Sequence, residues 1–324
     1  MGFFQRIFGA PQADSEEQEQ RTQERNFNTL RDDGVRAMRM GEPGYAVRCF
    51  ESALNIKQDA QTQGFLAEAY LRKGNLEKAL PLLETLSAEA PDNTSVQLLR
   101  ATTLGRMGRY EDMKTICDDL VKDAETNPAV LYACAEAAYG LKDLFTAIAR
   151  LTQTIEQAAD HLPARLLRAR ILCDMGQAAQ AMEDVEVLLQ ADADNEEFGL
   201  LQAEALLQTG QTEAAEAALL HVHELYPFSQ EAVLRLGSLY ENTSRRDKAL
   251  AIYDEAIELQ PDFAEAYKQR GGVRLALHDK EGAADDLRRA LELKPEVVAE
   301  VEGEFTNVEN QMADRYRTMN PYGF

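Results

Sequence analysis

The sequence predicts an all-α protein in which one pair of helices is repeated along the chain. Small residues recur at intervals of 33 or 34 residues in eight places, and a second, mostly small residue follows each of them by twelve. A glycine follows five members of the first set by seven residues. A fixed period of this length is the signature of stacked repeats. The first set comprises Gly34, Ala67, Ala101, Ala135, Ala169, Ala203, Gly237 and Gly271.

Each repeat is predicted to contain two helices with a tight turn between them. In the last full repeat, residues 263–277 form the expected first helix and residues 280–293 the second. Elsewhere the turn carries a glycine, which adopts the positive φ of a helix C-terminus without steric cost. The small residues are expected where two helices cross closely, because a bulky side chain would force the helices apart. The turn glycines are Gly41, Gly74, Gly108, Gly176 and Gly210.

Two repeats carry the most complete pattern. The second has Leu66, Ala67, Tyr70, Gly74, Ala79 and Pro91, and the seventh has Leu236, Gly237, Tyr240, Ala249, Tyr253, Ala256 and Pro261. This pattern resembles the tetratricopeptide repeat, a helix-turn-helix unit of about 34 residues. The resemblance covers about residues 27–295, although the chain has no tryptophan and Lys142 replaces the turn glycine of the fourth repeat. It implies a right-handed α-solenoid of about eight units with a C-terminal capping helix, instead of the two globular domains that length alone predicts.

We predict four segments: an N-terminal apolar segment with a polar linker (1–26), the solenoid (27–295), the capping helix (296–317) and a tail (318–324). Residues 11–25 are nearly all polar, which predicts a linker or a frayed helix. Apolar residues between 298 and 316 recur every three or four positions. This spacing predicts an amphipathic helix that covers the open face of the last repeat, with a dimerising coiled coil as the alternative.

The extreme N-terminus has a different character from the linker. Phe3, Phe4, Ile7 and Phe8 fall on one face of a helix. This segment either packs on the first repeat or stays disordered, as chain ends often do, or it contacts a partner or a membrane surface.

Charge and cysteine usage exclude several classes of protein. Lysine and arginine total 34 against 56 acidic residues, a net charge of -22, which argues against a nucleic-acid-binding protein. The sequence has no uncharged apolar run of 18 residues, so we expect no membrane span. The four cysteines lie far apart, which is typical of unpaired thiols in a reducing compartment. We therefore expect a cytoplasmic protein.

Sequence motifs of catalysis and metal binding are missing. The sequence has no phosphate-binding glycine loop, no His-Glu-x-x-His motif and no nucleophile elbow. His221 and His223 are two residues apart, a spacing that points them in different directions on a helix. Adjacent acids such as Asp285 and Asp286 are typical of solvated helix faces. We therefore expect no enzyme activity, no cofactor and no metal site.

Because no catalytic or metal-binding motif is present, we expect the protein to act through a binding surface. In the family that the repeats resemble, the first helix of each unit lines the concave side. The resemblance implies that the fifth and twelfth positions of the units form an apolar strip there, flanked by charged residues that include Arg170. Helix packing is the alternative role of these side chains. The residues of the strip that we expect to bind a partner are Leu98, Tyr132, Tyr139, Leu166, Leu200, Leu207 and Leu234, and Leu71, Cys173 and Leu275 share its twelfth position.

Four arginines stand out in this acidic chain. Arg39, Arg72 and Arg106 share one register of the first three repeats, and Arg31 lies two turns before Arg39. Arginine is a good helix former, so an ordinary exposed helix face is one interpretation. The other is a basic ladder that binds carboxylates of a partner peptide, because the planar guanidinium suits them.

The sequence as a whole favours a non-enzymatic scaffold that binds a protein or peptide, including one with an acidic segment, in the concave groove. We expect a monomer. The alternative is a self-associating structural subunit, hence a dimer, that uses the terminal helix or the apolar N-terminus.

Overall fold

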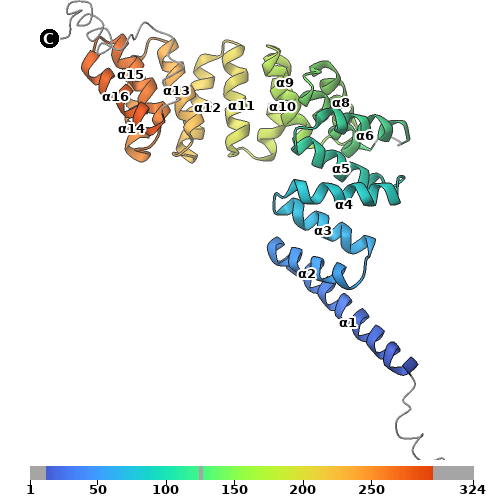
Figure 1. Cartoon of the computed structure of the whole chain (residues 1–324). Helices are drawn as coiled ribbons and strands as arrows, with labels where there is room; N and C mark the ends of the chain where they lie inside the picture. Colours follow the sequence, from blue (N-terminus) through green and yellow to red (C-terminus); the bar gives the residue numbers. More distant parts are fainter. Residues whose placement is uncertain (1–11, 124–126, 295–324) are drawn as a thin grey trace, which may run out of the picture. The chain divides into compact units, whose positions relative to one another are not determined.

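The computed structural model describes residues 12–123 and 127–294, and the side chains of residues 17–122 and 127–294. Over these residues the chain forms sixteen α-helices and no strand (Figure 1). The predicted all-α helical-repeat solenoid is confirmed. Residues 1–11, 124–126 and 295–324 lie outside these ranges, so the predicted N-terminal apolar segment, capping helix and tail lie outside the described residues.

The helices form eight successive pairs within the described range, and most have 13 or 14 residues. Their bounds are α1 Gln12–Arg39, α2 Pro43–Ile56, α3 Ala60–Arg72, α4 Leu76–Glu89, α5 Thr94–Arg106, α6 Tyr110–Asp123, α7 Pro128–Gly140, α8 Leu144–Gln157, α9 Leu162–Asp174, α10 Ala178–Ala191, α11 Glu196–Gln208, α12 Thr212–Leu225, α13 Gln230–Asn242, α14 Arg246–Leu259, α15 Ala264–Ala276 and α16 Lys280–Leu293.

The turn inside each pair adopts the left-handed backbone that the glycine register predicts. The five turn glycines have φ between 71° and 78°. In the second pair, the Gly74 amide donates to the Leu71 carbonyl at 3.1 Å and the Asn75 amide donates to the Tyr70 carbonyl at 2.9 Å. These bonds satisfy the carbonyls at the end of α3, as in a Schellman motif. Three turns keep the same backbone without glycine, at Lys142, Ser244 and His278.

Short polar side chains begin many of the helices. Asn75 accepts from the Lys78 amide at 3.2 Å, and Asp143 accepts from the Thr146 amide at 3.1 Å. Each such bond satisfies an amide that has no partner within its own helix. First helices are capped in the same way by Asp59, Asn93, Asn127, Asn195 and Ser229.

Within each unit, the small residues of the first register lie where the two helices of a pair cross. Ala67, Ala101, Ala135 and Ala203 have no exposed surface. At Gly34 and Gly237 the space of a side chain is filled by the rings of Phe50 and Tyr253, respectively, so that an added Cβ would overlap the ring. The crossing is therefore close because the residue is small, as the register predicts.

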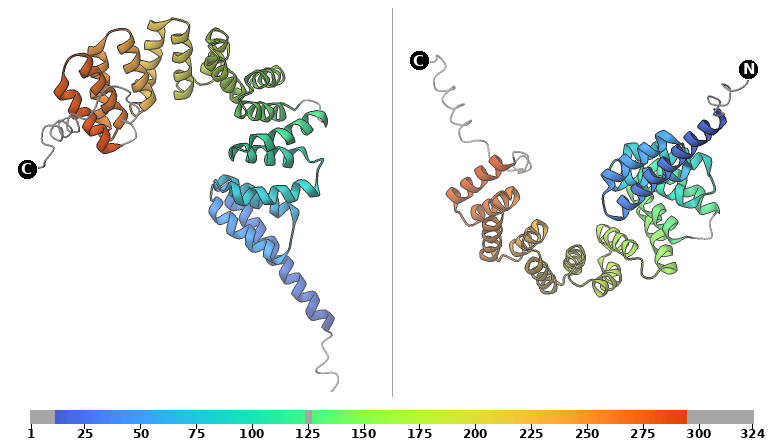
Figure 2. Two further views of the ribbon diagram at one scale, coloured as in Figure 1. Left: turned by 45° about the horizontal axis from the view of Figure 1, so that its top comes forward. Right: turned by 90° about the horizontal axis from the view of Figure 1, so that it is seen from below.

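The chain divides into two compact units, residues 1–171 and 172–324, with the boundary inside α9. Within each unit, consecutive helices lie side by side in the order of the chain (Figure 2). The first unit has one core around Phe50 and Leu83 and another around Met113 and Cys117. The second unit has a core around Leu236, Tyr240 and Tyr253. Each core is continuous across several helix pairs, because no pair buries its apolar face alone.

Helix α1 includes most of the polar segment for which the sequence left both a linker and a frayed helix open. It is one helix of 28 residues, so the predicted boundary at residue 26 lies inside it, and its first part extends beyond α2 (Figures 1 and 2). The residues of this part are mainly Glu, Gln and Arg, which favour helix without any tertiary contact. Arg21 pairs with Glu17 at 3.5 Å, and Lys57 of α2 reaches Glu24 at 3.3 Å.

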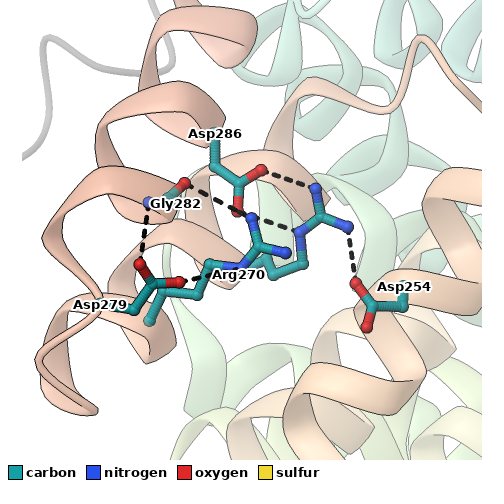
Figure 3. A network of polar contacts seen from close by, with 6 residues as sticks. Asp254, Arg270, Asp279, Gly282 and Asp286 are labelled. Carbon is teal, nitrogen blue, oxygen red and sulfur yellow. Dashed lines mark hydrogen bonds and ion pairs between the residues drawn. The ribbon is translucent and has the colours of Figure 1, made fainter.

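The last helix pair is joined by an ionic network that corrects one expectation (Figure 3). Asp286 of α16 is 3% exposed and therefore does not belong to a solvated face. It accepts from Arg270 at 2.6 and 3.0 Å and from Arg274 at 2.9 Å. Arg270 also donates to Asp254 of α14 at 2.6 Å. The buried carboxylate is stable there because two guanidinium groups of α15 satisfy it.

Candidate functional site

The first unit contains a pocket of about 610 Å³ that we call the α5–α9 pocket. It lies among four helices, α5, α6, α7 and α9, and it gathers five of the twelve residues predicted to bind a partner, namely Arg106, Tyr132, Tyr139, Leu166 and Arg170. Its other lining residues are Thr102, Gly105, Tyr110, Met113, Glu136, Pro163 and Leu167.

Local sequence explains how this pocket is built. Tyr132, Glu136 and Tyr139 are spaced by four and three residues, so they share one face of α7. Gly140 at the end of α7 has no side chain, and the ring of Tyr110 occupies the space that a Cβ would need. Gly105 admits the side chain of Met113 in the same way. Because these two glycines have no side chains, Tyr110 and Met113 of α6 can reach the pocket between the first helices.

The α5–α9 pocket combines an apolar and aromatic lining with a few charges. The ring of Tyr132 lies 5.0 Å from that of His161, and burial raises the pKa of the Tyr132 hydroxyl. Glu136 is half-buried; burial raises the pKa of its carboxyl, and a hydrogen bond with Tyr132 partly opposes that rise. Arg106 is exposed. Such a surface can bind a side chain with an apolar body and a polar end by non-covalent contact.

The second unit contains a larger pocket, of about 930 Å³, that we call the α11–α15 pocket. Two of the predicted residues, Leu207 and Leu234, line it. Polar side chains contribute most of the remaining lining, which comprises Glu204, Gln208, Thr212, Glu231, Arg235, Ser238, Leu239, Glu241, Asn242, Thr243, Tyr253 and Gln269.

Arg235 is the one basic side chain that lines the α11–α15 pocket, and it is held by acceptors on two helices. Its guanidinium lies 2.6 Å from Glu231 and 3.1 Å from Glu204, and it donates to the Leu200 carbonyl at 3.3 Å. Glu241 is a half-buried acid in the same lining. The Tyr253 hydroxyl donates to it at 3.3 Å, and burial raises the pKa of its carboxyl.

The remaining predicted residues are distributed differently. Leu98 and Leu200 are half-buried and pack against the cores of the first and second unit, respectively, as the packing alternative expects. Arg31 and Arg39 line a third hollow of about 450 Å³ together with Arg36 and Phe65.

Two of the four arginines of the basic ladder already form ion pairs, which the sequence does not predict. Arg72 pairs with Glu68 at 2.6 Å, and Arg31 pairs with Asp32 at 3.0 Å. Both partners come from the same helix as the arginine, so they offset part of its charge. Arg39 and Arg106 remain the exposed members with no ion pair among the described residues.

Sequence reasoning missed Tyr110 and Glu241. Glu241 occupies the same register as Tyr139, Cys173 and Leu207, which the apolar strip was drawn from. A charged residue in an otherwise apolar register is the signal in the sequence that marks Glu241. Tyr110 had no such signal, because its place in the pocket depends on the contact with Gly140.

Metal-binding groups, thiols and membrane spans are the remaining features of the described part of the chain. No group of three or more His, Cys, Asp or Glu side chains there is arranged to hold a metal ion. The four cysteines are free, and burial raises the pKa of the Cys173 thiol to about 11, with Glu204 as a smaller cause. None of the described helices combines the length and apolarity needed to cross a membrane.

Two parts of the chain match models of tetratricopeptide-repeat families. Residues 37–102 match a tetratricopeptide-repeat model, and residues 171–270 match the model of the N-terminal tetratricopeptide-repeat region of Psidin. Among solved structures, a tetratricopeptide-repeat protein from Parabacteroides merdae superposes with a TM-score of 0.58 at 18% identity, covering 72% of this chain and 93% of that one. PilW, a type IV pilus biogenesis factor, gives 0.59 at 19% identity, covering 65% and 98%. These two likenesses concern the fold.

Curated relatives are similar over limited lengths. A UDP-N-acetylglucosamine–peptide N-acetylglucosaminyltransferase of Giardia intestinalis is 27% identical over 250 residues, which are 75% of this chain and 16% of that protein. The DnaJ protein P58IPK homolog A of Oryza sativa is 25% identical over 50% of this chain and 37% of its own length. The chain thus spans well under half of each of these relatives. With the 34-residue register, the paired helices and the two model matches, the chain is a tetratricopeptide-repeat protein.

Proposed function

We propose that the chain is a non-enzymatic scaffold that binds a segment of a partner protein in the pockets along its first helices. The observation that carries this proposal is the α5–α9 pocket, where five predicted residues from three helices line one hollow. An apolar lining with a few charged groups is typical of a contact surface. The rigid helix pairs support it further, because a preformed surface loses little entropy on binding.

The finer part of the proposal concerns charge. We infer that an acidic stretch of the partner segment lies against Arg39 and Arg106, and that apolar side chains enter beside Leu166 and Tyr139. Both arginines are exposed and line hollows of the first unit. A bidentate bond between arginine and a carboxylate is worth about 1.5–3 kcal/mol, whereas an ordinary exposed ion pair is worth about 0.2–1 kcal/mol. Such contacts orient the segment while the apolar contacts supply most of the affinity.

We also propose a cytoplasmic location and a monomeric scaffold. The free state of Cys49, Cys117, Cys134 and Cys173 supports a reducing compartment.

The test begins with a random library of capped twelve-residue peptides selected on the purified full-length protein. Fluorescence polarisation then measures the affinity of selected peptides for the wild type and for the triple variant R39E/R72E/R106E. We expect acidic residues among the selected peptides and at least a tenfold loss of affinity in the variant, because about 1.4 kcal/mol corresponds to tenfold.

The matched control is R48E/R246E/R288E, which makes the same change of charge at exposed arginines that do not line the three hollows. It should bind like the wild type. Equal losses in both variants would show that only overall charge matters, and selection of no peptide at all would contradict the scaffold.

A further inference from the structure

We propose that the α11–α15 pocket binds a lysine or arginine side chain of an extended partner segment, with Glu241 as the counter-ion. This inference rests on the proposed function and adds a chemical class of ligand for the second unit. The occupant is a basic peptide segment, which the size of the pocket, its hydrogen-bonding groups and its charge favour.

The size and lining of the pocket suit an extended peptide. A volume of about 930 Å³ accommodates several residues. Gln208 of α11, Ser238 and Asn242 of α13, and Gln269 of α15 line it. Their amide and hydroxyl groups both donate and accept hydrogen bonds, as the main chain of a peptide requires. Leu207, which is 37% exposed, offers an apolar contact beside them.

The charge of the lining favours a cation. Three carboxylates, Glu204, Glu231 and Glu241, line the pocket against one guanidinium, that of Arg235. Arg235 already contacts Glu204 and Glu231 at 3.1 and 2.6 Å, so its positive charge is compensated from two sides. A carboxylate of a ligand would gain little from Arg235 and would meet three acids.

Glu241 is the acid that lacks compensation. It is half-buried, and the Tyr253 hydroxyl donates to it at 3.3 Å. No lysine or arginine nitrogen within the described ranges lies within ion-pair distance, 4.0 Å, of its carboxylate. Burial raises the pKa of this carboxyl, and Arg246 opposes the rise only as the last and smallest contributor. A ligand cation in the pocket would offset the cost of removing this charge from water.

The test uses three pools of acetylated, amidated nonapeptides and the full-length protein. Each pool fixes the central residue as Lys, Glu or Gln and draws the others from Ala, Leu, Ser and Asn. Fluorescence polarisation should show the Lys pool binding about tenfold more tightly than the Gln pool, a ratio of about 1.4 kcal/mol. The Glu pool is compared in R39E/R72E/R106E, because the ladder of the first unit is proposed to bind acidic peptides, and it should bind this variant more weakly than the Lys pool does. E241Q should abolish the preference for Lys, and E241K should reverse it. Glutamine still accepts from Tyr253, so E241Q is expected to fold.

Two controls separate this inference from the proposed function. E258Q removes an exposed carboxylate of α14 outside the pocket and should keep the preference for Lys. The ladder variant R39E/R72E/R106E should keep it as well, because its arginines lie in the first unit. Carbodiimide coupling of the Lys pool to the wild type supplies a readout without any variant: peptide mapping should place the new amide bond at Glu241.

The possible results either support or overturn the binding of a basic side chain by Glu241. Loss of the Lys preference in E241Q alone, with coupling at Glu241, supports the inference. Equal binding of the Lys and Gln pools, an unchanged preference in E241Q, coupling only at other acids, or failure of every pool to bind overturns it. The scaffold proposal is decided separately, by the library selection on the wild type.

Discussion

Lys142, Ser244 and His278 hold φ values of 64°, 60° and 67°, where five other turns of the repeat use glycine. A side chain in this left-handed region crowds its own backbone. We expect S244G to raise the free energy of unfolding by about 1 kcal/mol, since the relief of strain exceeds the entropy that glycine adds to the unfolded chain. Urea denaturation followed by circular dichroism measures this change. The reverse substitution G176A should lower stability, and a neutral result in both would show that the turn carries no strain.

At Asp286 the effect of one side chain should be large. Its side chain is 4% exposed and binds two arginines, whereas the side chain of the adjacent Asp285 is 64% exposed. D286A leaves Arg270 and Arg274 without their buried partner, so we expect a loss of about 3–5 kcal/mol in unfolding free energy. D285A should cost less than about 0.5 kcal/mol. Similar effects of the two variants on thermal unfolding would contradict the buried network.

Glu136 should make stability depend on pH. Burial raises the pKa of its carboxyl in the folded protein, so the folded state binds its proton more tightly than the unfolded state does. Stability from this group is therefore lost as pH rises through the range between the unfolded pKa and the raised folded one. E136Q should unfold at a higher urea concentration than the wild type at pH 7 and at the same concentration at pH 4. A wild-type advantage at pH 7 would mean that the carboxylate has a compensating partner.

At the scale of helices, the small residues allow the two helices of a pair to pack closely. Ala203 of α11 has no exposed surface. We expect A203L to destabilise the protein by about 1–3 kcal/mol, because extra volume at a close crossing forces the backbone to shift. A217L on the exposed face of α12 provides the control and should change stability by less than about 0.5 kcal/mol. Denaturation midpoints that coincide for the two variants would show that the register is misplaced in this repeat.

The helices were more predictable than their ionic contacts. Periodic features such as Ala203 and Gly74 repeat eight and five times, so the register placed the crossings and turns correctly. The first part of α1 lacks an apolar stripe, so the sequence did not decide between a linker and a frayed helix there. The burial of Asp286 depends on arginines twelve and sixteen residues away on another helix, which local composition does not reveal. Glu241 was hidden for a related reason, because its burial and its contact with Tyr253 are tertiary.

For the whole molecule, the net charge of -22 and the local ladder act on a partner in opposite directions. The net negative charge of the chain repels an acidic peptide. Once the peptide is bound, the attraction between its carboxylates and the nearby arginines outweighs this repulsion. Salt screens exposed charges beyond about 8 Å at physiological ionic strength. We expect the affinity of acidic peptides to fall as salt increases, as measured by fluorescence polarisation. Stronger binding in high salt would show that repulsion by the whole chain outweighs the ladder.

The central claim is that the pockets among the first helices bind the partner segment. Hydrogen–deuterium exchange of the full-length protein, with and without a selected peptide, tests it most directly, because exchange reports local opening helix by helix. The account predicts slower exchange in α5 and α7 with a selected acidic peptide, and in α11 and α13 with a peptide of the Lys pool, because residues of these helices line the two pockets. Protection confined to the second helices α4, α8 and α10, or to residues 1–11 and 295–324, would contradict it.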